Sequence, residues 1–244
     1  QAILAQSSWN QELNIMASEA LPQLLYFDVP GRVAGLRILM FTLFGKEGWE
    51  DRRVAFKDWP AVKATLGLQC LPVLTLPSGT HHQAEAMMRW AGRKAGLYPA
   101  DEDAALHVDE MMSCVHEALS KAPRPSSTVS AEMLPQLWKE FTEGEKAPMK
   151  MYFDYIQERI AGPFFAGQEL SVADLSLYML VNYFVNGEIP HIAAGYVETG
   201  FPRIKAHHEA VKNHPIVKAY DAAYADRSEA VDEVKDFETG NAKQ

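Results

Sequence analysis

The sequence predicts a small α/β domain followed by an all-helical domain, and three observations carry this prediction. From Leu24 to Gly96, short apolar runs and helical patterns follow one another in the order strand, helix, strand, then strand, strand, helix. After Asp101, every periodic segment has the spacing of a helix. Between the halves, Tyr98-Pro99-Ala100-Asp101 has the composition of a short linker. We therefore expect domains at 20–98 and 101–226, an extension at 1–19 and a charged tail at 227–244.

The first half opens with a strand, a helix and a second strand. Leu24-Leu25-Tyr26-Phe27 is an apolar strand that runs into a Pro-Gly turn. The helix after the turn ends near Gly45, and its apolar residues recur at helical spacing: Val33, Leu36, Leu39, Met40 and Leu43. Residues 49–56 alternate charged and apolar side chains, which predicts a strand, and Trp59-Pro60 opens a short irregular stretch.

A hairpin and a helix complete this half. Residues 70–76 predict a buried strand, Pro77-Ser78-Gly79 a turn, and Thr80-His81-His82 the return strand. The next helix runs from Gln83 through Lys94 and ends at Gly96, because glycine readily adopts the conformation that closes a helix.

The second half predicts helices only. The expected helices are 104–121, 134–142, 149–160, one that starts at Ser171, one that ends at 213–215, and 216–224. The first of them should turn four apolar residues inward: Leu106, Met111, Val115 and Leu119. Ser171-Val172-Ala173-Asp174 is a capping box, in which we expect the Ser side chain to accept an amide N–H and the Asp to reach back.

Composition and charge disfavour several classes of partner and location. The net charge of −9 over 244 residues disfavours nucleic acid or an anionic membrane surface as a partner. No apolar run approaches the roughly 20 residues of a membrane span. The first 20 residues contain no Lys or Arg, so a signal peptide is not expected and a cytoplasmic location is the default. Met16-Ala17-Ser18 is a plausible native start, which would make residues 1–15 an added extension.

No metal site is expected from the cysteines and histidines. Cys70 and Cys114 are the two cysteines, too few for a disulfide framework, and no Cys/His spacing matches a zinc site. The histidine pairs 81–82 and 207–208 are adjacent in sequence, so their side chains point apart.

Tyr26 is the candidate catalytic residue. Its hydroxyl stands at the end of a strand beside the start of a helix, where it can donate a hydrogen bond into a cleft. If that cleft binds an anion, the hydroxyl can act on it. The alternative is a tyrosine that only ends a core strand.

Three further features fit a cleft for a short, extended, acidic peptide. A cis bond at Leu71-Pro72 would turn the Leu71 backbone toward a ligand, whereas a trans proline would simply begin a strand. Gln83-Ala84 opens a helix whose free amides favour a carboxylate, unless Gln83 is only a polar cap residue. Trp59 and Lys63 can line the other wall, or be a packed Trp and a solvated Lys.

Taken in order, these motifs resemble the cytosolic glutathione S-transferases. They are most similar to the sigma class, which includes the glutathione-dependent prostaglandin D synthases and the S-crystallins. The pattern is Tyr26-Phe27-x-x-x-Gly31-Arg32-x-x-x-x-Arg37, Trp59-Pro60-x-x-Lys63, Leu71-Pro72-Val73-Leu74 and Gln83. The capping box at 171–174 matches as well, and the resemblance covers residues 22–226. It implies a thioredoxin-like domain with a mixed four-stranded sheet, and a homodimeric detoxification enzyme that uses glutathione and no metal.

The resemblance also implies roles for individual residues. Tyr26 would stabilise the glutathione thiolate for attack on a small hydrophobic electrophile. Glutathione would be held by Arg32, Trp59, Lys63, Gln69, Cys70, Leu71, Pro72, Gln83 and Ala84. Glu117 stands where relatives usually have an Asp that reaches the ligand of the partner subunit.

The second substrate would lie between the loop Asp28-Val29-Pro30 and the helix that carries Met111, Met112 and Val115. One position departs from the family pattern, because Ala84 replaces the usual Ser or Thr and a hydroxyl donor to the γ-glutamyl carboxylate is lost. Two alternatives therefore stay open: a glutathione-dependent isomerase of the prostaglandin synthase type, and a non-enzymatic, crystallin-like scaffold.

Overall fold

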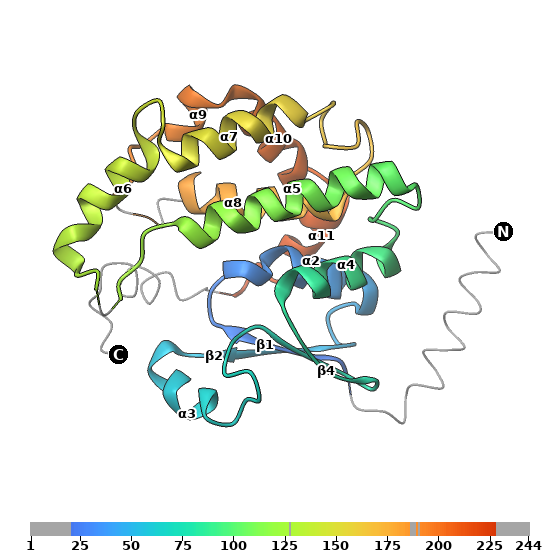
Figure 1. The fold of residues 1–244 in the computed structure, drawn as a ribbon. Helices are drawn as coiled ribbons and strands as arrows, with labels where there is room; N and C mark the ends of the chain where they lie inside the picture. Colours follow the sequence, from blue (N-terminus) through green and yellow to red (C-terminus); the bar gives the residue numbers. More distant parts are fainter. Residues whose placement is uncertain (1–20, 127, 186–188, 190, 228–244) are drawn as a thin grey trace.

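The computed structural model describes residues 21–126, 128–185, 189 and 191–227. The expected extension at 1–19 and residues 228–244 of the expected tail lie outside the described residues. A four-stranded sheet forms one end of the described part and the helical domain the other (Figure 1). In chain order the elements are β1 Gln23–Phe27, η2 Gly31–Val33, α2 Ala34–Phe44, β2 Glu50–Val54, η3 Phe56–Asp58, α3 Trp59–Lys63, β3 Val73–Leu76, β4 Gly79–His82, α4 Ala84–Ala95, α5 Glu102–Lys121, η4 Ala131–Met133, α6 Leu134–Thr142, α7 Pro148–Arg159, α8 Val172–Val185, α9 Tyr196–Gly200, α10 Pro202–Lys212 and α11 Pro215–Ala223.

The sheet has the strand order β2-β1-β3-β4, which confirms the expected mixed four-stranded sheet. β1 pairs with β2 in parallel and with β3 in antiparallel orientation, and β3 and β4 form the hairpin. Along β1, Leu24 and Tyr26 are buried while their neighbours are half-buried, as the two-residue period of a strand requires. This period points Tyr26 toward the helical side of the sheet together with Leu24.

Helices α2 and α4 lie between the sheet and the helical domain (Figure 1). The two domains approach closely at Gly92 of α4, where an added Cβ would lie 2.2 Å from Cγ1 of Val172. The backbone N–H of Val172 also donates to the carbonyl of Leu97 over 3.0 Å. Glycine at position 92 therefore lets α4 pack directly on the start of α8, and the seam between the domains is fixed there.

The capping box at the start of α8 forms, but its hydrogen bonds differ from the expected pattern. Asp174 reaches back to the Ser171 N–H at 2.7 Å, as expected. The Ser171 hydroxyl donates to the same carboxylate at 2.7 Å, whereas we expected it to accept an amide N–H. The reason is that Asp174 is fully buried and needs donors, which Phe165 N–H and His207 Nε2 also supply.

Three expectations about the helices need correction. Leu106 on α5 is 69% exposed, because the buried face of α5 passes through Val108 and not through Leu106; Met111, Val115 and Leu119 are buried as expected. The stretch after Trp59 is a short helix, α3, in which Pro60 occupies the first turn, where proline is tolerated. The short helix α9 was not expected, since its five residues are too few for a periodic signal.

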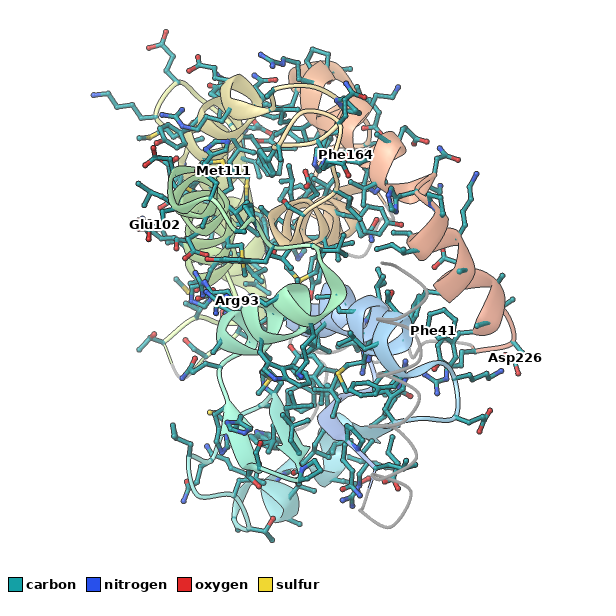
Figure 2. All side chains as sticks on the ribbon, turned by 90° about the vertical axis from the view of Figure 1, so that its right-hand side faces the viewer. Phe41, Arg93, Glu102, Met111, Phe164 and Asp226 are labelled. Atoms are coloured by element: carbon teal, nitrogen blue, oxygen red, sulfur yellow. The ribbon has the colours of Figure 1, made fainter. Side chains whose placement is uncertain are left out.

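The last helix, α11, packs against α2. Phe41 of α2 lies beside the segment that ends near Asp226 (Figure 2), and its ring meets those of Tyr220 and Tyr224 edge-on at 6.0 and 5.8 Å. Beyond the helix, the Arg227 guanidinium lies 2.8 Å from the carboxylate of Asp51. The described end of the chain is thus tied back to the α/β domain. None of the helices in the described ranges is long and apolar enough to cross a membrane.

Candidate active site

A cavity of about 230 Å³ is lined by residues from both domains. Tyr26, Arg32 and Leu71, three of the residues that the sequence singles out, line it on the side of the α/β domain. The opposite wall is largely apolar and comes from α5 to α8, where its main contributors are Leu119, Trp138, Met149, Leu180, Tyr183 and Phe184. The cavity therefore joins a phenol hydroxyl and a guanidinium to an apolar wall.

The Tyr26 side chain is buried, and its hydroxyl lies at the turn that follows β1. The backbone N–H of Arg32 donates to the hydroxyl oxygen over 3.2 Å. The ring packs edge-on against Phe27, with 5.5 Å between the ring centroids. Because the oxygen accepts this hydrogen bond, its own O–H proton stays available to donate to a ligand in the cavity.

Gly31 makes this position of Tyr26 possible. Its φ of +45° lies in the left-handed region that favours glycine. An added Cβ would lie 2.5 Å from Cε1 of Tyr26 and 2.7 Å from its hydroxyl oxygen. No side chain fits there without displacing the tyrosine ring.

We expect Gly31→Ala to displace Tyr26 and to lower the free energy of unfolding by about 2–4 kcal/mol, from backbone strain and overpacking together. Gly45→Ala is the matched control, because Gly45 has φ +70° but nothing within 4 Å of an added Cβ. Urea unfolding of both variants separates the strain, which they share, from the contact with Tyr26, which only the first makes. Equal losses in the two variants would show that this contact is unimportant.

Arg37 holds the loop between β1 and α2 in place. The side chain is 1% exposed and donates to the carbonyl oxygens of Phe27 at 3.0 Å and Val29 at 2.5 Å. Its Nε lies 3.1 Å from the carboxylate of Asp51. The guanidinium carbon is 5.9 Å from the centroid of the Tyr26 ring. One buried cation thus fixes the loop that carries the cavity wall and packs near the tyrosine.

The structure decides between the two alternatives left open at Leu71-Pro72. The Leu71–Pro72 peptide bond is cis. Within the described residues, neither the N–H nor the C=O of Leu71 makes a hydrogen bond to protein, so both can pair with an extended ligand. Gln83 has φ +76° and precedes α4, and its exposed side chain makes no capping hydrogen bond. The first N–H groups of α4 therefore have no side-chain cap from Gln83.

Four further predicted residues do not line the large cavity. Trp59 is half-buried and meets Phe27 edge-on at 5.4 Å. Lys63, at the end of α3, is exposed and makes no ion pair within the described part of the chain. Gln69 is exposed with φ +50°, and Cys70 is a half-buried free thiol. Gln69 and Cys70 directly precede Leu71 in the chain, whereas Trp59 and Lys63 come from α3.

Ala84 lies at a narrower pocket of about 30 Å³, which Arg32, Glu85 and His116 also line. One guanidinium nitrogen of Arg32, Nη1, is hydrogen-bonded to Nδ1 of His116 at 3.0 Å. The same His116 nitrogen lies 2.5 Å from Oε1 of Glu85. Arg32 thus lines both the large cavity and this pocket. Its backbone N–H binds Tyr26, and its side chain contacts His116 where the two domains meet.

One expectation about α5 needs revision, and Glu117 stays a prediction. Met111, Met112 and Val115 are buried and do not line the large cavity, because that face of α5 packs against α8. The loop residue Val29 does line it, as expected. Glu117 is exposed and pairs with Lys121 at 2.7 Å, outside both pockets. Lys121 lowers the pKa of the Glu117 carboxyl through this hydrogen bond.

Sequence reasoning missed the residues that close the cavity and those that join the domains. Trp138, Leu180 and Phe184 belong to helices that were predicted, but helical periodicity does not distinguish an apolar residue of the core from one at a cavity wall. Glu85 and His116 are 31 positions apart, and no local pattern links them. The sequence offered one indication of Glu85, which directly follows the predicted binding residue Ala84.

Comparison with known proteins supports the resemblance. Residues 129–223 match the family model described as glutathione S-transferase, C-terminal domain. A glutathione S-transferase of Anopheles gambiae is 32% identical over 92 residues, which are 38% of this chain and 44% of that protein. The hematopoietic prostaglandin D synthase of Rattus norvegicus is 32% identical over 101 residues, which are 41% of this chain and 50% of the relative. The chain thus matches about half the length of these relatives.

The fold is also found among solved structures. The structure of rat hPGDS complexed with a quinoline superposes with a TM-score of 0.71 at 20% identity, and the match covers 87% of this chain and 100% of that one. At this identity the superposition shows the fold and not the activity. The described domains therefore have the glutathione S-transferase architecture.

Proposed function

We propose that this chain, a member of the glutathione S-transferase family by its fold and its C-terminal domain, is an enzyme that transfers glutathione to small hydrophobic electrophiles. One observation carries the proposal. The Tyr26 hydroxyl accepts the Arg32 N–H over 3.2 Å at an otherwise largely apolar cavity, so its proton can stabilise an anion there. A thiolate beside an apolar electrophile needs this combination of groups.

The energetics agree with this role. A free thiol has a pKa of about 8.5, so only a few per cent is thiolate at neutral pH. Lowering that pKa by about two units requires roughly 2.7 kcal/mol. A charge-assisted hydrogen bond from Tyr26 in a water-poor cavity supplies much of it. The hydrogen bond that Tyr26 accepts from Arg32 polarises its O–H and strengthens the donation.

The surface beside Tyr26 fits a short peptide that carries carboxylates. We assign the cysteinyl backbone of glutathione to the unpaired N–H and C=O of Leu71, and the γ-glutamyl carboxylate to the start of α4 at Gln83 and Ala84. The other contacts would come from Arg32, Trp59, Lys63, Gln69, Cys70 and Pro72. Glu117 lies outside both pockets, so we propose that it acts across a homodimer, on the ligand of the partner subunit. We also propose that this dimer works in the cytoplasm, in detoxification.

A second candidate is a glutathione-dependent isomerase of the prostaglandin D synthase type. It is favoured by the 32% identity to the rat enzyme and by a largely apolar cavity that can take a lipid-like substrate. Turnover of an aryl halide with glutathione tests the transferase, and product analysis with an endoperoxide tests the isomerase. A scaffold protein would show neither activity, and failure to bind immobilised glutathione at millimolar concentrations would favour it.

Ala84→Ser should increase glutathione affinity by about tenfold, because it restores a hydroxyl donor to the γ-glutamyl carboxylate. Calorimetric Kd values for glutathione measure the effect, and KM should fall in parallel. Ala86→Ser is the matched control, since Ala86 is exposed on the same helix and should change neither value. An unchanged Kd in the first variant would indicate that the carboxylate does not bind at position 84.

A further inference from the structure

One nitrogen atom of His116 contacts both a hydrogen-bond donor, Arg32, and a hydrogen-bond acceptor, Glu85. Arg32 Nη1, which can only donate, is hydrogen-bonded to Nδ1 of His116 at 3.0 Å. Glu85 Oε1, which accepts when ionised, lies 2.5 Å from the same Nδ1. A histidine nitrogen either holds a lone pair, which suits Arg32, or a proton, which suits Glu85. It cannot serve both at once.

The hydrogen bond from Arg32 requires a lone pair on Nδ1, which only the neutral histidine has. The contact between Nδ1 and Arg32 is a hydrogen bond at 3.0 Å, whereas Glu85 Oε1 lies 2.5 Å from the same nitrogen without a hydrogen bond among the described residues. Glu85 Oε1 is itself buried and finds no hydrogen-bond donor among the described residues. A buried carboxylate oxygen without a donor is costly, and a proton on Nδ1 is the nearest way to satisfy it.

We propose that His116 is a positioning residue for Arg32, and that protonation transfers its Nδ1 from Arg32 to Glu85. Neutral His116 holds the Arg32 guanidinium at the narrow pocket. Protonated His116 donates to Glu85, and the proton comes from solvent. Arg32 Nη1 then loses its partner, and the guanidinium can turn to the large cavity that it already lines.

The charged groups that face His116 are few among the described residues. Arg32 comes from η2 and Glu85 from α4, while α8 contributes only Ser176 and Met179 to the pocket. On its own helix, the neighbouring Glu117 pairs with Lys121. Among the described residues, one cation and one carboxylate therefore lie at His116, whose side chain is 43% exposed.

This inference rests on the proposed function where it concerns catalysis. A guanidinium turned toward the Tyr26 cavity adds positive charge beside the thiolate and stabilises it. Histidine changes charge between about pH 5 and 8, so activity should carry an ionisation of His116 besides that of the thiol. The gain should be up to about fivefold, the size that a partly exposed charge pair supports.

The first test needs no glutathione. Histidine ring signals of the whole protein are followed by NMR against pH, and the His116 signal is identified by its absence in His116→Asn. Burial lowers the pKa of His208 to about 4. Glu85→Gln should move the midpoint of His116 to lower pH, because the charged imidazole loses the negative charge beside it. An unchanged midpoint would overturn the inference.

The second test is the pH profile of kcat/KM for glutathione and an aryl halide. In His116→Asn, the ratio of kcat/KM at low pH to that at high pH should fall by up to about fivefold relative to the wild type. His107→Asn is the control, because His107 faces Glu110 on the same helix and lines neither pocket. An active wild type with the same profile in both variants would refute the role of His116. A wild type without any turnover would instead overturn the proposed function, while the NMR titration still decides whether Nδ1 changes partner.

Discussion

Tyr26→Phe is expected to lower kcat/KM for glutathione conjugation by about 10- to 100-fold, because it removes one charge-assisted hydrogen bond to the thiolate. The KM for glutathione should change little, since the tripeptide is held elsewhere along the cleft. The ring keeps its packing against Phe27, so the fold should be retained. Steady-state kinetics with a generic aryl halide measure the loss.

The sign of the accompanying pH effect follows from the charge of the thiolate. Without the Tyr26 donor the anion is less stable, so the glutathione thiol in the complex should ionise at higher pH. Thiolate absorbance of the binary complex against pH shows this directly. Tyr98→Phe is the matched control, because Tyr98 is a half-buried tyrosine outside both pockets. Equal activity of the two variants would contradict the catalytic assignment of Tyr26.

Much of the fold is predictable because its signals are local. The Pro-Gly turn after Phe27, the glycine that ends α4 and the capping box at Ser171 each act within a few residues. They set the element order, and the order of motifs then indicates the family. Leu106 shows the limit, because an apolar residue at the edge of an amphipathic face can point either way until the packing partner is known.

The site is less predictable, because it depends on contacts that are distant in the sequence. The position of Tyr26 requires glycine at position 31, five residues further along the chain. The hydrogen bond from the Arg32 N–H to the Tyr26 hydroxyl spans six residues and forms only once the turn is folded. The contact of Arg32 with His116 spans 84 positions and exists only when the two domains meet. A hydrogen-bond acceptor recruited from another domain leaves no trace in local composition. The cavity wall is likewise a property of packing.

The largest loss of stability is expected from Asp174→Ala. Asp174 is 0% exposed and accepts hydrogen bonds from the Ser171 N–H and hydroxyl, the Phe165 N–H and His207 Nε2, at 2.7 to 2.9 Å. Alanine removes all four acceptor contacts and leaves buried donors without partners. We expect the free energy of unfolding to fall by about 3–5 kcal/mol, the range for breaking a buried polar pair from one side. Urea unfolding measures it.

Two further variants make this expectation specific. Asp109→Ala removes a carboxylate that pairs with Arg89 at 2.7 Å but is 37% exposed, so it should cost no more than about 1 kcal/mol. Ser171→Ala removes only the hydroxyl bond and should cost about 1–2 kcal/mol, which keeps the expectation testable if Asp174→Ala does not fold.

Since Val172, the next residue, packs against Gly92 where the two domains meet, loosening the start of α8 should also lower the activity that depends on both cavity walls. A stable Asp174→Ala protein with normal unfolding would mean that this buried network does not hold the seam.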